Sequence, residues 1–110
     1  LESVAFKVPT ITTDLAGFGL WANMLKGGKY SEIEDGVKVI HRSDYNYSEV
    51  ADVIRDTIVD FSAKSDTEVK KIRKNAASVA EKALWKHFIR YYYEAYDIAL
   101  CNAQKRNSQA

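Results

Sequence analysis

The sequence predicts an α/β fold in which two short strands are followed by helices. Residues 8–13 and 37–41 are short runs rich in β-branched side chains, which is typical of strands. After the second run, apolar residues recur at helical spacing up to about residue 103. With 110 residues and a hydrophobic fraction of 46%, the chain can bury one core. Strands followed by helices of this kind indicate a sheet with helices on its faces.

Turn residues separate the elements of the first part of the chain. Pro9 stands at the start of the first strand, where a missing N–H group is tolerated. Gly17 and Gly19 can adopt positive φ or allow close backbone approach, so a tight turn is expected there. The elements predicted in order are the end of a helix at 1–6, a strand at 8–13, a turn at 14–19, a short helix at 20–26, an exposed loop at 29–36 and a strand at 37–41.

Three helices are predicted in the second part of the chain. Ser48 is expected to cap the first, which runs to about Ser62. Ser65 and Glu68 form a capping box that opens the second. The third has an apolar stripe over five turns, expected to pack in a core, and the tail 104–110 is expected to fray. That stripe consists of Trp85, Phe88, Ile89, Tyr92, Tyr96, Ala99, Leu100 and Ala103. Two strands do not make a stable parallel sheet, so we expect further strands upstream.

Composition excludes several classes of protein. The net charge of +1 argues against a nucleic-acid binder that works through bulk electrostatics. No apolar run approaches the roughly 20 residues that span a bilayer, so no membrane partner is expected, and the cytoplasm is the default location. A single cysteine, Cys101, excludes an internal disulfide, and its place on an apolar stripe predicts a buried thiol.

Residues 2–11 follow the pattern Glu-Ser-x-Ala-x-x-x-Pro-Thr-Ile, which resembles the segment after the nucleotide-sugar site of two-domain (GT-B) glycosyltransferases. In that resemblance, Glu2 matches the second of two glutamates, whose carboxylate accepts hydrogen bonds from the ribose hydroxyls of the donor. A carboxylate suits a vicinal diol because its two oxygens accept two O–H donors at once. Without the family, Glu2 is read as an ordinary surface residue.

Three further blocks resemble the glycogen synthases of glycosyltransferase family 3, of the animal and fungal type. Residues 13–19 resemble the family's Thr-(Asn/Asp)-Leu-(Ser/Ala)-Gly-Phe-Gly stretch, which makes Gly17 and Gly19 a candidate donor-side turn. Residues 35–40 and 84–93 resemble the family's next strand and its Trp-Lys-x-x-x-x-Tyr-Tyr closing helix. The resemblance covers residues 1 to about 103. Read without it, the glycines form a tight turn and the aromatic stripe is core packing.

The resemblance implies that residues 1–110 are the closing half of a Rossmann-like, GT-B C-terminal domain, with two strands, three or more helices and a long C-terminal helix. The implied activity is retaining transfer of glucose from UDP-glucose to the non-reducing end of an α-1,4-glucan, without metal or cofactor. The catalytic residues are expected in a missing N-terminal part of the same polypeptide, so the fragment is expected to be inactive alone. A homo-oligomer is compatible with this reading.

Two other functions stay open at this point. A glycosyltransferase of the same fold with another acceptor, such as a capsule or lipopolysaccharide sugar, would share residues 2–11. A non-enzymatic α/β interaction module would explain the apolar stripes and helix caps equally well. It gives no reason for Glu2 followed by the Pro-Thr-Ile run.

Cationic residues gather in the second half of the chain. Residues 1–63 carry 6 basic and 10 acidic side chains, whereas residues 64–110 carry 10 basic and 5 acidic, which indicates packing of one half on the other or an anion site in the second. Regulated family members sense glucose 6-phosphate with an arginine-rich helix. Here Arg73 stands among lysines, so Arg73 and Lys74 are a candidate weak anion site beside the simpler reading of a solvated helix face. His41 and His87 have no partner at ligand spacing.

Overall fold

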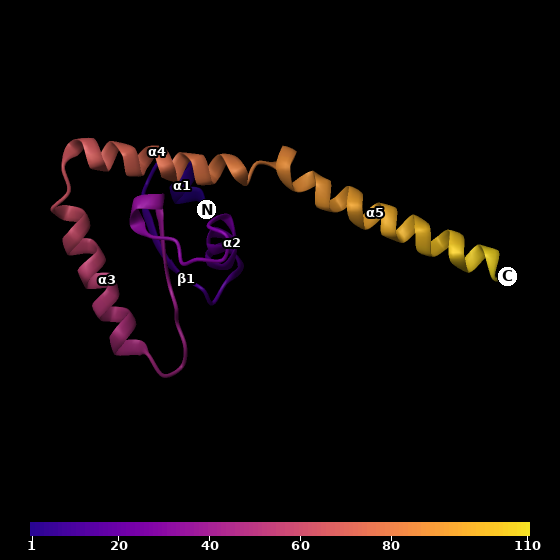
Figure 1. The fold of residues 1–110 in the computed structure, drawn as a ribbon, viewed down its shortest axis with the longest axis horizontal. Helices are drawn as coiled ribbons and strands as arrows, with labels where there is room; N and C mark the ends of the chain where they lie inside the picture. The colour runs from indigo at the N-terminus through magenta and orange to yellow at the C-terminus, as the bar shows by residue number, and fades with distance from the viewer.

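The computed structural model describes residues 1–110 and confirms the mixed α/β class, with a two-stranded parallel sheet and a long C-terminal helix (Figure 1). The chain is mostly helical, with 66% of its residues in helices. The elements in order are α1 (Glu2–Ala5), β1 (Thr10–Thr13), α2 (Gly17–Leu25), the 3₁₀ helix η1 (Ile33–Asp35), β2 (Val37–Ile40), α3 (Tyr47–Ser62), α4 (Asp66–Lys82) and α5 (Trp85–Ser108).

The two strands pair in parallel, with Thr10 opposite Val37 and Thr13 opposite Ile40. Parallel strands need a crossover connection, which α2 and η1 supply. The first strand begins two residues later than predicted, because Pro9 has no N–H group and the Val8 N–H donates to the Ser3 carbonyl at 3.0 Å in the turn after α1. The two strands end side by side, because Thr13 pairs with Ile40.

The core is small and lies where α1, α2 and α4 meet β2. Its fully enclosed cluster consists of Val4, Ala22, Val37, Val39 and Ala76. Figure 1 shows α4 passing beside α1 and the sheet, while α3 runs down one side of the molecule. In α4, Ile72 and Ala76 are four residues apart, on one face of the helix, and both are buried against these elements.

The predicted exposed loop at 29–36 is confirmed only in part: Lys29, Tyr30, Glu32 and Glu34 are exposed, whereas Ser31, Ile33 and Gly36 are buried. Ser31 is buried, and its polar groups are paired inside the chain. Its N–H donates to Asn23 Oδ1 at 2.9 Å and its hydroxyl donates to the Val37 carbonyl at 2.6 Å. Gly36 has a φ of +95°, and an added Cβ would lie 2.4 Å from the Ala76 nitrogen. The loop therefore forms a surface on which the backbone of α4 rests directly.

The helix starts confirm one predicted cap and correct another. Ser65 Oγ accepts the Glu68 N–H at 3.2 Å and Glu68 Oε2 accepts the Ser65 N–H at 2.8 Å, which is the predicted capping box. Ser48, however, lies inside α3, whose N-cap is Asn46. The Asn46 side chain holds the preceding turn instead, accepting the Ser43 N–H at 2.7 Å and donating to the His41 carbonyl at 2.9 Å.

The long helix α5 corrects the expectation of core packing. It leads away from the body of the molecule, as Figure 1 shows, and none of its residues is buried. Cys101 is exposed, against the predicted buried thiol, because no other element of the chain lies opposite it. The helix also continues to Ser108, past the predicted fraying at residue 104. No helix of the molecule combines the length and the apolar character required to cross a bilayer.

Candidate functional site

Polar side chains meet where the two parallel strands end. Asp14 follows β1 and His41 follows β2, and the Asp14 N–H donates to the Ile40 carbonyl at 3.1 Å. Asp14 Oδ2 lies 2.7 Å from His41 Nδ1 and accepts the Tyr30 hydroxyl at 2.9 Å. Asp14 Oδ1 accepts the Arg42 N–H at 2.9 Å. The carboxyl edge of a parallel sheet, where α/β proteins place ligands, therefore carries a carboxylate that is held from three sides.

These hydrogen bonds change the acidity of two groups. The hydrogen bond from His41, and next the one from the Arg42 backbone, lower the pKa of Asp14 to about 2. The same carboxylate raises the pKa of the Tyr30 hydroxyl, because the hydrogen bond that Tyr30 donates to it favours the protonated phenol. Asp14 is thus an acceptor that stays ionised, and it holds the loops after β1 and β2 together.

The sequence did not predict this pair, because His41 has no partner at ligand spacing along the chain. The two residues are 27 positions apart, and no local pattern connects them. A usable signal was present, since each residue directly follows a predicted strand and the carboxyl ends of parallel strands lie at one edge. A cavity of about 270 Å³ adjoins His41 between β2 and α3, and Tyr30 and Glu49 are also among its lining residues.

We predict that Asp14→Asn lowers the free energy of unfolding at pH 7 by about 2 kcal/mol, because it weakens charge-assisted hydrogen bonds to a mostly buried carboxylate. The folded pKa of Asp14 lies below its ordinary value, so the stabilisation is present above about pH 4 and is lost as the pH falls towards 2. Urea unfolding from pH 7 to pH 2 measures both effects. Asp44→Asn, at an exposed carboxylate, is the control, and equal losses in the two variants would contradict the prediction.

The predicted donor-side turn is in part a helix. Helix α2 begins at Gly17, three residues earlier than expected, so Gly17 and Gly19 both lie in its first turn. Neither has a positive φ. Gly19 is buried against the end of β1: an added Cβ would lie 2.0 Å from the Thr13 carbonyl oxygen, whereas one at Gly17 would meet nothing within 4 Å. Positive φ and close backbone approach were the two reasons predicted for glycine here. Close approach applies to Gly19, and neither reason applies to Gly17.

Glu2 is the first residue of α1 and is exposed to solvent, and its side chain forms no hydrogen bond or ion pair with another residue. Its neighbour Ser3 shares a hydrogen bond of 2.7 Å with the Thr10 hydroxyl, at the start of β1. Gly17 and Gly19 instead follow the end of β1. Within this chain, no hydrogen bond or ion pair joins the Glu2 side chain to the predicted glycine turn or to the Asp14–His41 pair.

Arg73 and Lys74 do lie together on one surface. With Lys7 and Lys70 they line an open hollow of about 350 Å³, and none of the four side chains forms an ion pair with a carboxylate. Arg73 Nε donates to the Lys7 carbonyl at 3.1 Å, just after the end of α1, where Lys7 adopts a φ of +60°. One arginine donor thus has a structural role, and binding of an anion here stays a prediction.

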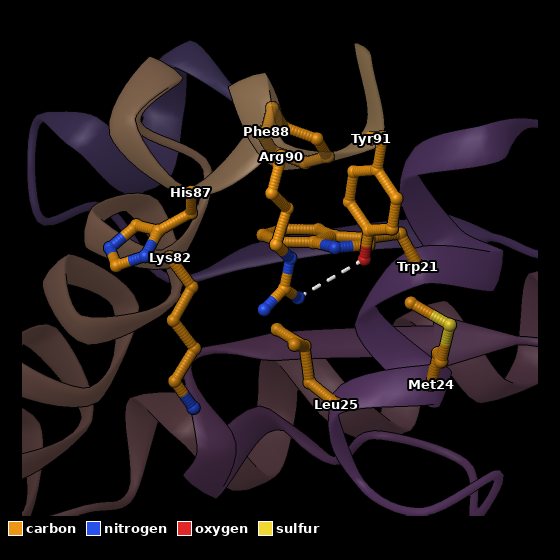
Figure 2. A pocket seen from close by; sticks show the side chains of 8 residues that line it. All are labelled: Trp21, Met24, Leu25, Lys82, His87, Phe88, Arg90 and Tyr91. Atoms are coloured by element: carbon orange, nitrogen blue, oxygen red, sulfur yellow. Dashed lines mark hydrogen bonds between the residues drawn. The ribbon is translucent and has the colours of Figure 1, made fainter. Parts of the chain in front are cut away.

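A second hollow lies at the joint between the body and α5 (Figure 2). It measures about 200 Å³ and is lined by Trp21, Met24, Leu25, Lys82, His87, Phe88, Arg90 and Tyr91. The Trp21 and Phe88 rings are 5.9 Å apart, and Arg90 donates to the Tyr91 hydroxyl at 3.2 Å. The contact between Trp21 and Phe88 attaches the first turns of α5 to α2. No cluster of histidine, cysteine or acidic side chains in the chain is arranged to hold a metal ion.

Comparison with known proteins brought no match. A scan against models of protein families found no matching family, a search of curated proteins found no similar sequence, and a search of solved structures found no similar fold. A function for this chain is therefore argued from its sequence pattern and from the positions of its own residues.

Proposed function

We propose that this chain is the closing part of the nucleotide-sugar-binding domain of a retaining glycosyltransferase, which transfers glucose from UDP-glucose to the non-reducing end of an α-1,4-glucan. The observation that carries the proposal is the succession of motifs along the chain. Glu2 and the Pro-Thr-Ile run precede β1, the Gly-Phe-Gly turn follows it, and the Trp-Lys pair opens the closing helix. The first resembles GT-B glycosyltransferases, and the other two resemble glycogen synthases of glycosyltransferase family 3.

The arrangement of β1 and α2 supports this proposal. In open α/β sheets, ligands bind in the crevice beyond the carboxyl ends of parallel strands. Here the chain leaves β1 at Thr13 and enters α2 within four residues, and Gly19 brings the helix backbone against the strand end. This geometry is compatible with a nucleotide-binding domain. It is also compatible with other α/β proteins, so the motifs decide between them.

Glu2 is the residue of this chain assigned to the donor. Its carboxylate is exposed and has no protein partner, so both oxygens are available to accept the two ribose hydroxyls. Ionised acceptors form hydrogen bonds roughly twice as strong as neutral ones. In this role Glu2 positions the nucleotide and does not take part in bond breaking, which we assign to residues outside Leu1–Ala110.

The proposal is tested by glucose incorporation into glycogen, measured with the complete polypeptide that contains these residues and with labelled UDP-glucose or ADP-glucose. We expect incorporation from UDP-glucose by the complete polypeptide and none by the 110-residue chain alone. Incorporation from ADP-glucose alone would show that the base of the donor is adenine and not uracil. UDP binding without incorporation would indicate that the acceptor is a sugar other than an α-1,4-glucan. If the polypeptide neither binds UDP nor incorporates glucose, the enzyme assignment is overturned in favour of an interaction module.

A further inference from the structure

The connection between β2 and α3, residues 41–46, is attached to the rest of the sheet by one carboxylate. Apart from the first turn of α3, every hydrogen bond that these residues form with another part of the chain goes to Asp14. His41 Nδ1 lies 2.7 Å from Asp14 Oδ2, and the Arg42 N–H donates to Asp14 Oδ1 at 2.9 Å. Figure 1 shows this connection at the end of the molecule opposite α4. Its attachment to the end of β1 therefore depends on a single side chain.

The connection is itself a well-formed turn. Asn46 Oδ1 accepts the Ser43 N–H at 2.7 Å, and Asn46 Nδ2 donates to the His41 carbonyl at 2.9 Å. The Arg42 guanidinium donates to Asn46 Oδ1 at 3.3 Å and lies over the Tyr47 ring, 5.7 Å from its centroid. These contacts do not involve Asp14, so a weaker bond to Asp14 displaces the turn as a unit.

One of the two donors to Asp14 changes its charge near neutral pH. The Arg42 N–H does not titrate, whereas an imidazole is the side chain whose charge ordinarily changes between about pH 5 and 8. The pKa of Asp14 is about 2, so its carboxylate stays ionised in that range. Tyr30 donates to the same oxygen of Asp14, which raises the pKa of its hydroxyl, so it stays protonated. The His41 side chain is 64% exposed and exchanges protons with solvent.

The other charged groups near the imidazole are those that line the cavity between β2 and α3. Glu49 faces this cavity from α3, and Lys38 and Glu32 face it from β2 and from the loop before η1. Lys38 forms an ion pair with Glu32, so its charge is compensated. The carboxylates of Glu49 and Asp14 therefore make the surroundings of His41 negative, which is the sign that attracts an imidazolium.

Protonation of His41 strengthens its bond to Asp14. In an imidazolium both ring nitrogens donate, whereas in the neutral ring Nδ1 donates in one tautomer and is an acceptor in the other. In the second tautomer, a lone pair of Nδ1 would face the carboxylate. A hydrogen bond between charged groups is also roughly twice as strong as one between neutral groups. The attachment is thus strongest while the imidazole is charged, and it weakens as the pH rises and the imidazole loses its proton.

We propose that Asp14 and His41 form a proton-sensitive clasp, which holds residues 41–46 against the end of β1 when the imidazole is charged and loosens when it becomes neutral. The clasp lies at the carboxyl edge of the parallel strands, where α/β proteins bind ligands. The pH then determines how freely one loop of that edge moves. The clasp does not depend on the proposed glucosyl transfer, because neither residue is assigned to the donor.

Hydrogen exchange followed by mass spectrometry, on the complete polypeptide that contains these residues, tests the clasp. The readout is the protection of the amides of residues 42–46 at about pH 5.5 and about pH 8, corrected for the intrinsic pH dependence of exchange. We expect about fivefold more protection at the lower pH, from the difference between a charge-assisted and a neutral hydrogen bond. Peptides from α4 are the internal reference, with equal corrected protection at both pH values. Equal protection of residues 42–46 at the two pH values would overturn the proposal.

Three variants assign the response to the pair. His41→Asn replaces the imidazole by an amide that does not titrate, and we expect the same protection of residues 42–46 at both pH values. Asp14→Asn is expected to lower the protection at both pH values and to remove its pH dependence. His87→Asn is the matched control, because His87 also lies beside a carboxylate, 3.3 Å from Glu81, but at the joint between α4 and α5. A pH dependence that persists in the His41 or Asp14 variant, or that disappears in the His87 variant, would overturn the proposal.

Discussion

Gly19→Ala is expected to lower the free energy of unfolding by about 3 kcal/mol or more, which is the largest loss that we predict for a single methyl group in this chain. Its Cβ would lie 2.0 Å from the Thr13 carbonyl oxygen and 3.4 Å from Val39 Cγ1. The first obstacle is backbone that hydrogen-bonded strands hold in place, so α2 itself has to move. Urea unfolding followed by circular dichroism measures the loss.

Gly17→Ala is the matched control, since it adds the same methyl group two residues earlier in the same helical turn. Nothing lies within 4 Å of that Cβ and the residue has no positive φ. Alanine restricts the unfolded chain more than glycine does, so we expect a change within about 1 kcal/mol, on the stabilising side. Similar losses in both variants would show that contact with the strand end does not determine the glycine at position 19.

Glu2→Gln in the complete polypeptide is expected to lower kcat/KM for UDP-glucose by about 10- to 100-fold. The substitution replaces an ionised acceptor, and hydrogen bonds to charged groups contribute about 1.5–3 kcal/mol. The ribose is remote from the bond that breaks, so the loss should appear as a higher KM with kcat nearly unchanged. Steady-state rates with UDP-glucose and saturating glycogen measure both parameters. This prediction depends on the proposed function.

The control for Glu2→Gln is Glu94→Gln, at another exposed glutamate that lies on α5, outside its apolar stripe. Both variants should unfold at the same temperature as the unchanged protein, because neither glutamate side chain forms a hydrogen bond or an ion pair within the chain. An unchanged KM for the Glu2 variant would remove Glu2 from the donor site. A fall in kcat with an unchanged KM would assign it a role in the reaction step.

Local pattern predicted the elements of this chain well where the physical cause was local. The capping box of Ser65 and Glu68 is complete within four residues, and the structure confirms it. The two β-branched runs form the two strands within one or two residues of their predicted bounds. The start of α3 was misplaced, because Asn46 competes with Ser48 and its side chain is held by residues on the other side of the turn.

Helical periodicity predicted which residues of α5 share a face, and it did not predict what that face contacts. The stripe from Trp85 to Ala103 lies on one side of the helix, yet it is not buried in a core of this chain. An apolar stripe on a helix indicates only that this face is expected to pack against another surface, and it does not identify that surface. The same limit applies to Cys101, which was predicted as buried from the stripe and is exposed.

The sequence by itself determined the element types, the parallel α/β class and the motif succession from Glu2 to the closing helix, because propensity, caps and turn residues act over a few positions. Only the tertiary structure decided that Asp14 and His41 meet, that Gly19 touches the Thr13 carbonyl and that Arg73 caps the turn at Lys7. These contacts join residues up to 66 positions apart. They arise from strand pairing and helix packing, to which many weak interactions contribute together, so no short stretch of sequence encodes them.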